Sequence, residues 1–152
     1  MRRYTVRKLH LLVAKLDRSA DVYLRREFGI SYNRALVLLI ILNNDPLTQH
    51  QLAVELGNSD PAVSNMLVEL KKENLVTTEQ DPNHGRRKNV RLTPKGRALA
   101  EEINAGTIDN FGVLLKAAKV DEKEFSSMLD RMLKMLDYER AEQLRKLAIE
   151  LR

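Results

Sequence analysis

Residues 47–96 read LTQHQLAVELGNSDPAVSNMLVELKKENLVTTEQDPNHGRRKNVRLTPKG, and this stretch decides the fold. Thr48 and Gln51 have the spacing of a capping box, so a short helix is expected to start there and to stop at Gly57. After a tight turn, Pro61 lies where the first turn of a second helix tolerates proline. This order predicts a helix-turn-helix.

A β-hairpin is expected directly after the second helix. The apolar period changes from 3.6 to 2 beyond Asn74. Residues 76–79 alternate in polarity, residues 81–85 have the composition of a turn, and residues 89–92 form a second strand-like run. The sequence therefore predicts two antiparallel strands, and Thr93 followed by proline then starts another helix.

Helical patterns also flank this stretch. Apolar residues recur at helical spacing over residues 9–28, and residues 35–42 are apolar on every side, which is typical of a buried central helix. Residues 94–118 and 121–151 carry further apolar stripes. We therefore expect a mostly α-helical protein with a small β-hairpin.

The chain of 152 residues is expected to form a single domain. Residues 31–106 would form a winged helix-turn-helix lobe, and the N- and C-terminal helices, in residues 1–30 and 107–152, a helical dimerisation region. The Met- and Leu-rich stripe from Met128 to Leu147 has little core left to cover it in one subunit, which favours an isologous homodimer. The alternative is that the terminal helices pack on their own subunit.

Positive charge is concentrated in one place. Residues 82–97 contain six Lys and Arg residues and no Asp or Glu, whereas the whole chain has a net charge of only +5. Such a cluster is typical of a surface that neutralises nucleic-acid phosphates. A solvated basic loop is the alternative.

Several other classes of function are excluded or disfavoured. The absence of cysteine excludes disulfides, thiolate metal sites and cysteine nucleophiles. His10, His50 and His84 fall on separate elements, so no metal site is expected, and no phosphate-cradling glycine loop or nucleophile elbow suggests an enzyme or a cofactor. No apolar run approaches the roughly 18 residues of a membrane span and no signal peptide is recognisable, which predicts a cytoplasmic protein.

Motifs in register along the chain carry a family resemblance. They are LAVELG at 52–57, Leu70, LV at 75–76, DP at 81–82 and, most specifically, LTPKG at 92–96 after the basic wing. In this order they resemble the MarR family of bacterial and archaeal transcription regulators, over nearly the whole chain. The resemblance implies a homodimer that binds a pseudo-palindromic operator in double-stranded DNA, usually as a repressor released by a small, often aromatic or phenolic, ligand.

The resemblance also implies which residues face DNA. It places the recognition helix at residues 59–73, with Val68 among the residues that face the major groove, and the wing tip beside the backbone and the minor groove. The residues expected at the DNA are Thr48, Ser59, Asp60, Pro61, Ser64, Asn65, His84, Arg86, Arg87 and Lys88.

This chain departs from the family pattern at some of these positions. Asp60 and Asn65 stand where a basic residue is common; Asn65 can pair with adenine, while Asp60 either accepts from a cytosine amino group or serves only as a helix cap. At the wing tip, His84 occupies the place of an acidic brace, so Arg86 is expected to enter the minor groove without it, and His84 to contact only phosphate or solvent.

The family's effector site lies between the dimerisation and DNA-binding lobes. It implies His10, Val13, Arg34 and Leu39 as candidate ligand-binding residues. Two other functions remain open at this point: a nonspecific, architectural DNA-binding protein without an effector, and a helical dimerisation protein with a vestigial winged helix. Binding to one DNA sequence, to any DNA or to none distinguishes them.

Overall fold

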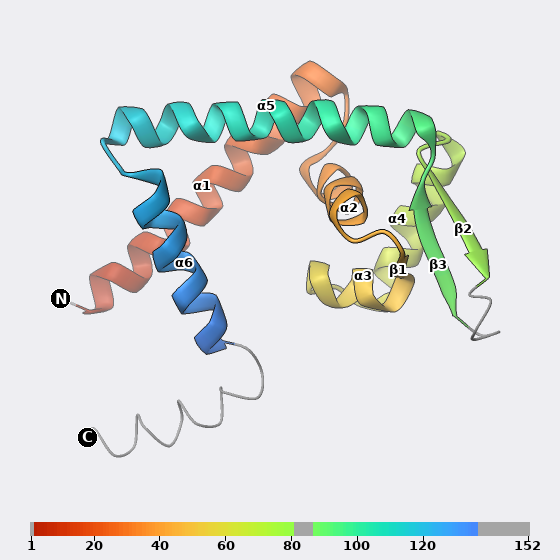
Figure 1. Cartoon of the computed structure of the whole chain (residues 1–152), viewed down its shortest axis with the longest axis horizontal. Coiled ribbons are helices and arrows are strands. Elements are labelled where there is room, and N and C mark those ends of the chain that lie inside the picture. Colours follow the sequence, from red (N-terminus) through yellow and green to blue (C-terminus); the bar gives the residue numbers. More distant parts are fainter. Residues whose placement is uncertain (1, 81–86, 137–152) are drawn as a thin grey trace, which may run out of the picture. The chain divides into compact units, whose positions relative to one another are not determined.

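Figure 1 shows the computed structural model of the chain, which describes residues 2–80 and 87–136. The structure is mostly helical with a small antiparallel sheet, as the sequence predicts. Its elements follow in the order α1 (Arg2–Phe28), α2 (Tyr32–Asn43), β1 (Leu47–Thr48), α3 (Gln49–Leu56), α4 (Asp60–Lys72), β2 (Val76–Gln80), β3 (Lys88–Leu92), α5 (Pro94–Ala118) and α6 (Glu122–Leu136). The chain divides into two compact units, residues 1–107 and 108–152.

Helix α2 is the centre of the first unit. Its residues Ala35, Val37, Leu38 and Ile41 are fully buried, which confirms the expectation drawn from its all-round apolar pattern. They belong to a single core cluster that also includes Leu24 of α1, Leu52 of α3, Val63, Leu67 and Leu70 of α4, Val90 of β3, and Ala100 and Ile103 of α5. This shared core holds α3 and α4 against the sheet.

The sheet has three strands rather than the two that the sequence predicts. Its order is β1-β3-β2, with both pairs antiparallel, so Thr48 lies opposite Asn89, and Gln80 lies opposite Lys88. The extra strand, β1, is only two residues long, so it is too short to show an alternating pattern. Because Thr48 belongs to β1 and also precedes α3, the start of α3 is fixed beside the start of β3.

Left-handed residues end several helices where the sequence indicates. Gly29 follows α1 with a φ of 66°, Gly57 follows α3 with a φ of 62°, and Asn74 lies just beyond α4 with a φ of 58°. Ser31 occupies the N-cap position of α2, but its side chain forms no capping hydrogen bond.

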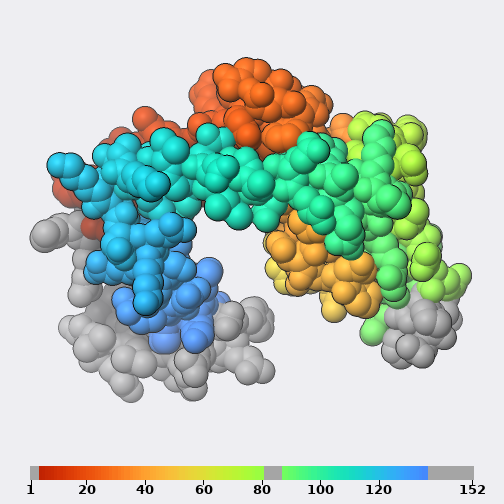
Figure 2. All heavy atoms as spheres, turned by 45° about the horizontal axis from the view of Figure 1, so that its top comes forward, coloured from red at the N-terminus to blue at the C-terminus, as the bar shows by residue number. Residues whose placement is uncertain are grey.

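The LTPKG motif fastens the start of α5 to the segment between α4 and β2. The Thr93 hydroxyl donates to the carbonyl oxygen of Asn74 at 2.7 Å and accepts from the Gly96 N–H at 2.9 Å. A Cβ atom on Gly96 would lie 1.9 Å from the carbonyl oxygen of Leu75, so only glycine fits there. In Figure 2 the green atoms at the start of α5 lie against the yellow-green atoms of α4 and β2.

The second unit contains the end of α5 and all of α6. The Asp121 carboxylate accepts from the Glu124 N–H at 2.7 Å and so caps α6. The rings of Phe111 and Phe125 pack at a centroid distance of 6.3 Å. No residue of α6 is buried. Within residues 2–80 and 87–136, none of the helices is both long and apolar enough to cross a membrane.

Candidate nucleic-acid interface

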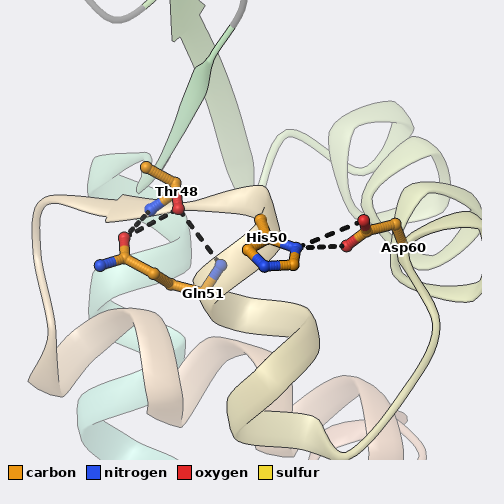
Figure 3. A network of polar contacts seen from close by, with 4 residues as sticks. All are labelled: Thr48, His50, Gln51 and Asp60. Carbon is orange, nitrogen blue, oxygen red and sulfur yellow. Dashed lines mark hydrogen bonds and ion pairs between the residues drawn. The ribbon is translucent and has the colours of Figure 1, made fainter.

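The first turn of α3 is held by the predicted capping box (Figure 3). The Thr48 hydroxyl accepts from the Gln51 N–H at 3.2 Å, and the Gln51 side-chain oxygen accepts from the Thr48 N–H at 2.9 Å. These reciprocal bonds satisfy two donors at the helix start, so they fix the direction in which α3 leaves β1.

The first turn of α4 is tied to α3 by a histidine. Ser59 is the N-cap residue without a side-chain capping bond, and Asp60 is the first helical residue rather than the cap. The Asp60 carboxylate lies 3.3 Å from Nδ1 of His50, measured to each of its oxygens (Figure 3). Since both side chains are more than half exposed, this contact orients Asp60 more than it stabilises the fold.

An open groove joins these two helix starts to the wing. Its volume is about 620 Å³, and it is lined by Thr48, Gln49, His50, Gln51, Asp60, Ser64, Arg87 and Lys88. Five of the ten residues that the sequence analysis expects at the DNA therefore meet in one place: Thr48, Asp60, Ser64, Arg87 and Lys88. Helix starts with free N–H groups beside two cations form a surface suited to phosphate.

The other expected DNA residues lie outside this groove. Ser59, Pro61 and Asn65 are exposed along α4. His84 and Arg86 lie outside the residues that the structure describes, so their expected roles at the wing tip stay predictions.

The basic cluster of residues 82–97 divides into two groups. Arg91 and Arg97 approach the Asp45 carboxylate at 3.6 and 3.5 Å, and the Lys95 ammonium donates to the carbonyl oxygen of Glu73 at 3.0 Å. By contrast, Arg87 and Lys88 form no ion pair within the described part of the chain. Among the described residues of the cluster, Arg87 and Lys88 are therefore the two cations held by neither a carboxylate nor a carbonyl group, and their side chains can turn to an external phosphate.

The candidate effector residues are not gathered into one site in the described part of the chain. His10 and Val13 are exposed on α1. On α2, the Arg34 guanidinium forms an ion pair with Glu73 at 2.5 Å, and Leu39 packs against the core. Arg34 therefore has a structural role that links α2 to the end of α4.

Sequence reasoning missed three residues of the groove. Gln49, His50 and Gln51 line it from the first turn of α3, whereas the sequence analysis considered His50 only as a possible metal ligand. The sequence contained a signal for this contact. A helix-turn-helix brings its two helix starts together, and His50 and Asp60, ten residues apart, lie at these two starts. A hydrogen bond between side chains across that turn was the interaction to look for.

Comparison with known proteins agrees with this architecture. Residues 28–87 match the sequence model of the MarR family. MepR, a transcription regulator of the Staphylococcus aureus multidrug efflux pump MepA, is 28% identical to this chain. Its structure in the DNA-binding conformation gives a TM-score of 0.73 over 90% of this chain and 96% of MepR. A MepR–DNA complex gives 0.68 over the same shares.

A more distant structure shares the fold. NadR in complex with 4-hydroxyphenylacetate is 19% identical, with a TM-score of 0.76 over 86% of this chain and 91% of NadR. No curated protein sequence matches the chain.

The recognition helix, the three-stranded sheet and the wing define a winged helix-turn-helix protein. The family match lies on the helix-turn-helix and the wing, and the likeness to MepR extends over nine-tenths of the chain. Residues 28–87 thus match the MarR family, which is a family of transcription regulators and not of enzymes, and the chain is similar in fold to the transcription regulator MepR.

Proposed function

We propose that this protein is a sequence-specific regulator that inserts α4 into the major groove of duplex DNA and sets its wing on the backbone. The observation that carries the proposal is the groove beside the starts of α3 and α4, where Arg87 and Lys88 form no ion pair with any described residue. Phosphates bound there would place the outward face of α4 against base edges. The complex of the related MepR with DNA supports this arrangement.

The protein acts as a homodimer on a pseudo-palindromic operator. Helix α6 supports this, because all its residues are at least partly exposed and Met132, Leu133 and Leu136 are exposed by 46%, 62% and 67%. A second copy would bury this stripe and would double the number of bases read.

Repression and release by a small aromatic or phenolic effector complete the proposal. The match of residues 28–87 to the MarR family supports repression, and the complex of NadR with 4-hydroxyphenylacetate supports an effector of this chemistry. Of the four candidate residues, His10 and Val13 are exposed on α1, whereas Arg34 and Leu39 already serve the fold. 4-Hydroxyphenylacetate is a direct first probe: it should lower the affinity of the dimer for its operator.

Selection of a duplex from a random pool tests the function. We expect one enriched pseudo-palindromic sequence, and Asn65→Ala should weaken binding to it by roughly 1 to 3 kcal/mol with little effect on random DNA. Asn33→Ala, at an exposed asparagine on α2, is the matched control. Equal affinity of the wild type for every sequence would instead identify an architectural DNA-binding protein, and no binding would remove DNA from the function.

A further inference from the structure

The outward face of α4 is a narrow stripe opposite the core. Val63, Leu67 and Leu70 are at most 2% exposed and mark the inward side of the helix. With 3.6 residues per turn, Asn65 and Val68 project from the opposite side, one turn apart. Both are exposed, Val68 by 46%.

Helix α4 has no free cation for base recognition. Residues 60–68 contain no Lys or Arg. Lys71 donates to the Thr78 hydroxyl at 2.5 Å, and the Lys72 ammonium lies 2.8 Å from the Glu69 carboxylate. Arg or Lys paired to guanine is the commonest specific contact in the major groove, and residues 60–68 of α4 contain no side chain that could make it. In the proposed function, α4 must therefore discriminate bases through the amide of Asn65, the carboxylate of Asp60 and the apolar side chain of Val68.

The apolar group on this face is Val68. A β-branched residue lowers helix propensity, and this one is largely outside the core, so folding gains little from it. In the major groove, the group that an apolar side chain recognises is the C5-methyl of thymine. Val68 lies about 4.5 Å along the helix axis from Asn65, which is comparable to the roughly 3.4 Å spacing of stacked bases.

We propose that Val68 is a specificity-determining residue that contacts the C5-methyl group of a thymine next to the base read by Asn65. This inference rests on the proposed function, because it assumes that α4 enters the major groove. It assigns to each operator half-site a thymine whose methyl group, rather than its hydrogen-bonding edge, is recognised.

Replacement of thymine by uracil tests the proposal, since uracil lacks only the methyl group. Each thymine of the selected operator half-site is replaced in turn, and the dissociation constant of the full-length protein is measured by fluorescence anisotropy. One replacement should weaken wild-type binding about fourfold, the value for one buried methyl group. In Val68→Ala that replacement should have no effect, and Val68→Ala should bind the thymine operator about as weakly as the wild type binds the uracil operator.

Val54→Ala is the matched control, because Val54 is 68% exposed on α3 and its variant should keep the fourfold preference for thymine. Alanine is the better helix former, so both variants should fold. If every uracil duplex binds the wild type as well as the thymine duplex, the proposal is wrong while sequence-specific binding stands. A preference that survives in Val68→Ala also overturns it, since another residue then reads the methyl. A wild type that selects no sequence refutes the proposed function itself.

Discussion

The two free cations of the wing should set the salt dependence of DNA binding. Arg87 and Lys88 line the groove and have no ion-pair partner in the described residues. Each phosphate contact contributes about 0.9 to the slope of log affinity against log salt, so replacing both by alanine should flatten the slope by about 1.8. Between 50 and 200 mM salt the wild type should then lose about 12-fold more affinity than the double variant.

Arg97→Ala is the matched control for this measurement. Arg97 belongs to the same basic cluster, but its guanidinium already faces Asp45 at 3.5 Å, so it should contribute little to the slope. Anisotropy titrations on the selected operator and on random DNA, at four salt concentrations, give the slopes. Arg87→Ala with Lys88→Ala should weaken both DNAs together and leave thermal unfolding unchanged, because both side chains are exposed. An unchanged slope in the double variant, or an equal change in Arg97→Ala, would show that the division of the cluster into free and paired cations is wrong.

Three further predictions concern the fold and the assembly. Gly96→Ala should lower the free energy of unfolding by about 3 kcal/mol, at the upper end for overpacking, because its Cβ would meet the Leu75 carbonyl at 1.9 Å. The thermal unfolding midpoint should then fall by about 6 to 12 °C. Gly112→Ala, with open space around it, should leave the midpoint unchanged. The hydrogen bonds from the Arg25 side chain and the Tyr32 N–H hold the pKa of Asp21 below its ordinary value of 3.8, so its contribution to stability is present above that pH and lost as the pH falls through the lowered pKa. Asp21→Asn should therefore lower the midpoint at pH 7, and this difference should shrink as the pH falls below 3.8. Leu133→Ser with Leu136→Ser should give monomers by light scattering, whereas Lys134→Ser should stay dimeric; a dimeric double variant would show that these two leucines do not hold the interface.

The helices and the hairpin could be predicted from the sequence because their signals are local. A capping box at Thr48, a helix end at Gly57 and a proline after Thr93 each act over three or four residues, and the structure confirms all three. Strand β1 could not be predicted, because a pair of residues becomes a strand only through its partners Asn89 and Val90, some 40 positions away in the chain.

The same distinction between local signals and long-range contacts explains which part of the charge pattern could be predicted. The sequence shows that the basic residues are close neighbours, but it does not show which of them are already paired. Asp45 lies about 50 positions before Arg91 and Arg97, and only the folded chain brings its carboxylate between them. For the same reason Asp60 could be expected near DNA, while its contact with His50 depends on the angle between two helices.

The motif that best identifies the family is therefore not the part of the chain that would choose a DNA sequence. LTPKG holds the start of α5 to the segment between α4 and β2 in two ways. The Thr93 hydroxyl forms hydrogen bonds there, and the backbone at Gly96 approaches the Leu75 carbonyl so closely that only glycine fits. These contacts lie within the fold and involve no DNA base. What the motif shares with the family is therefore the relative placement of the wing and the recognition helix, and with it the way in which we expect both to approach DNA. In the proposed function, base preference would rest instead on the exposed face of α4, where the resemblance places Asp60 and Asn65 at positions that are commonly basic. We accordingly expect this protein to share the approach of its relatives to DNA, and to prefer an operator in which adenine and thymine, rather than guanine, are the bases read by α4.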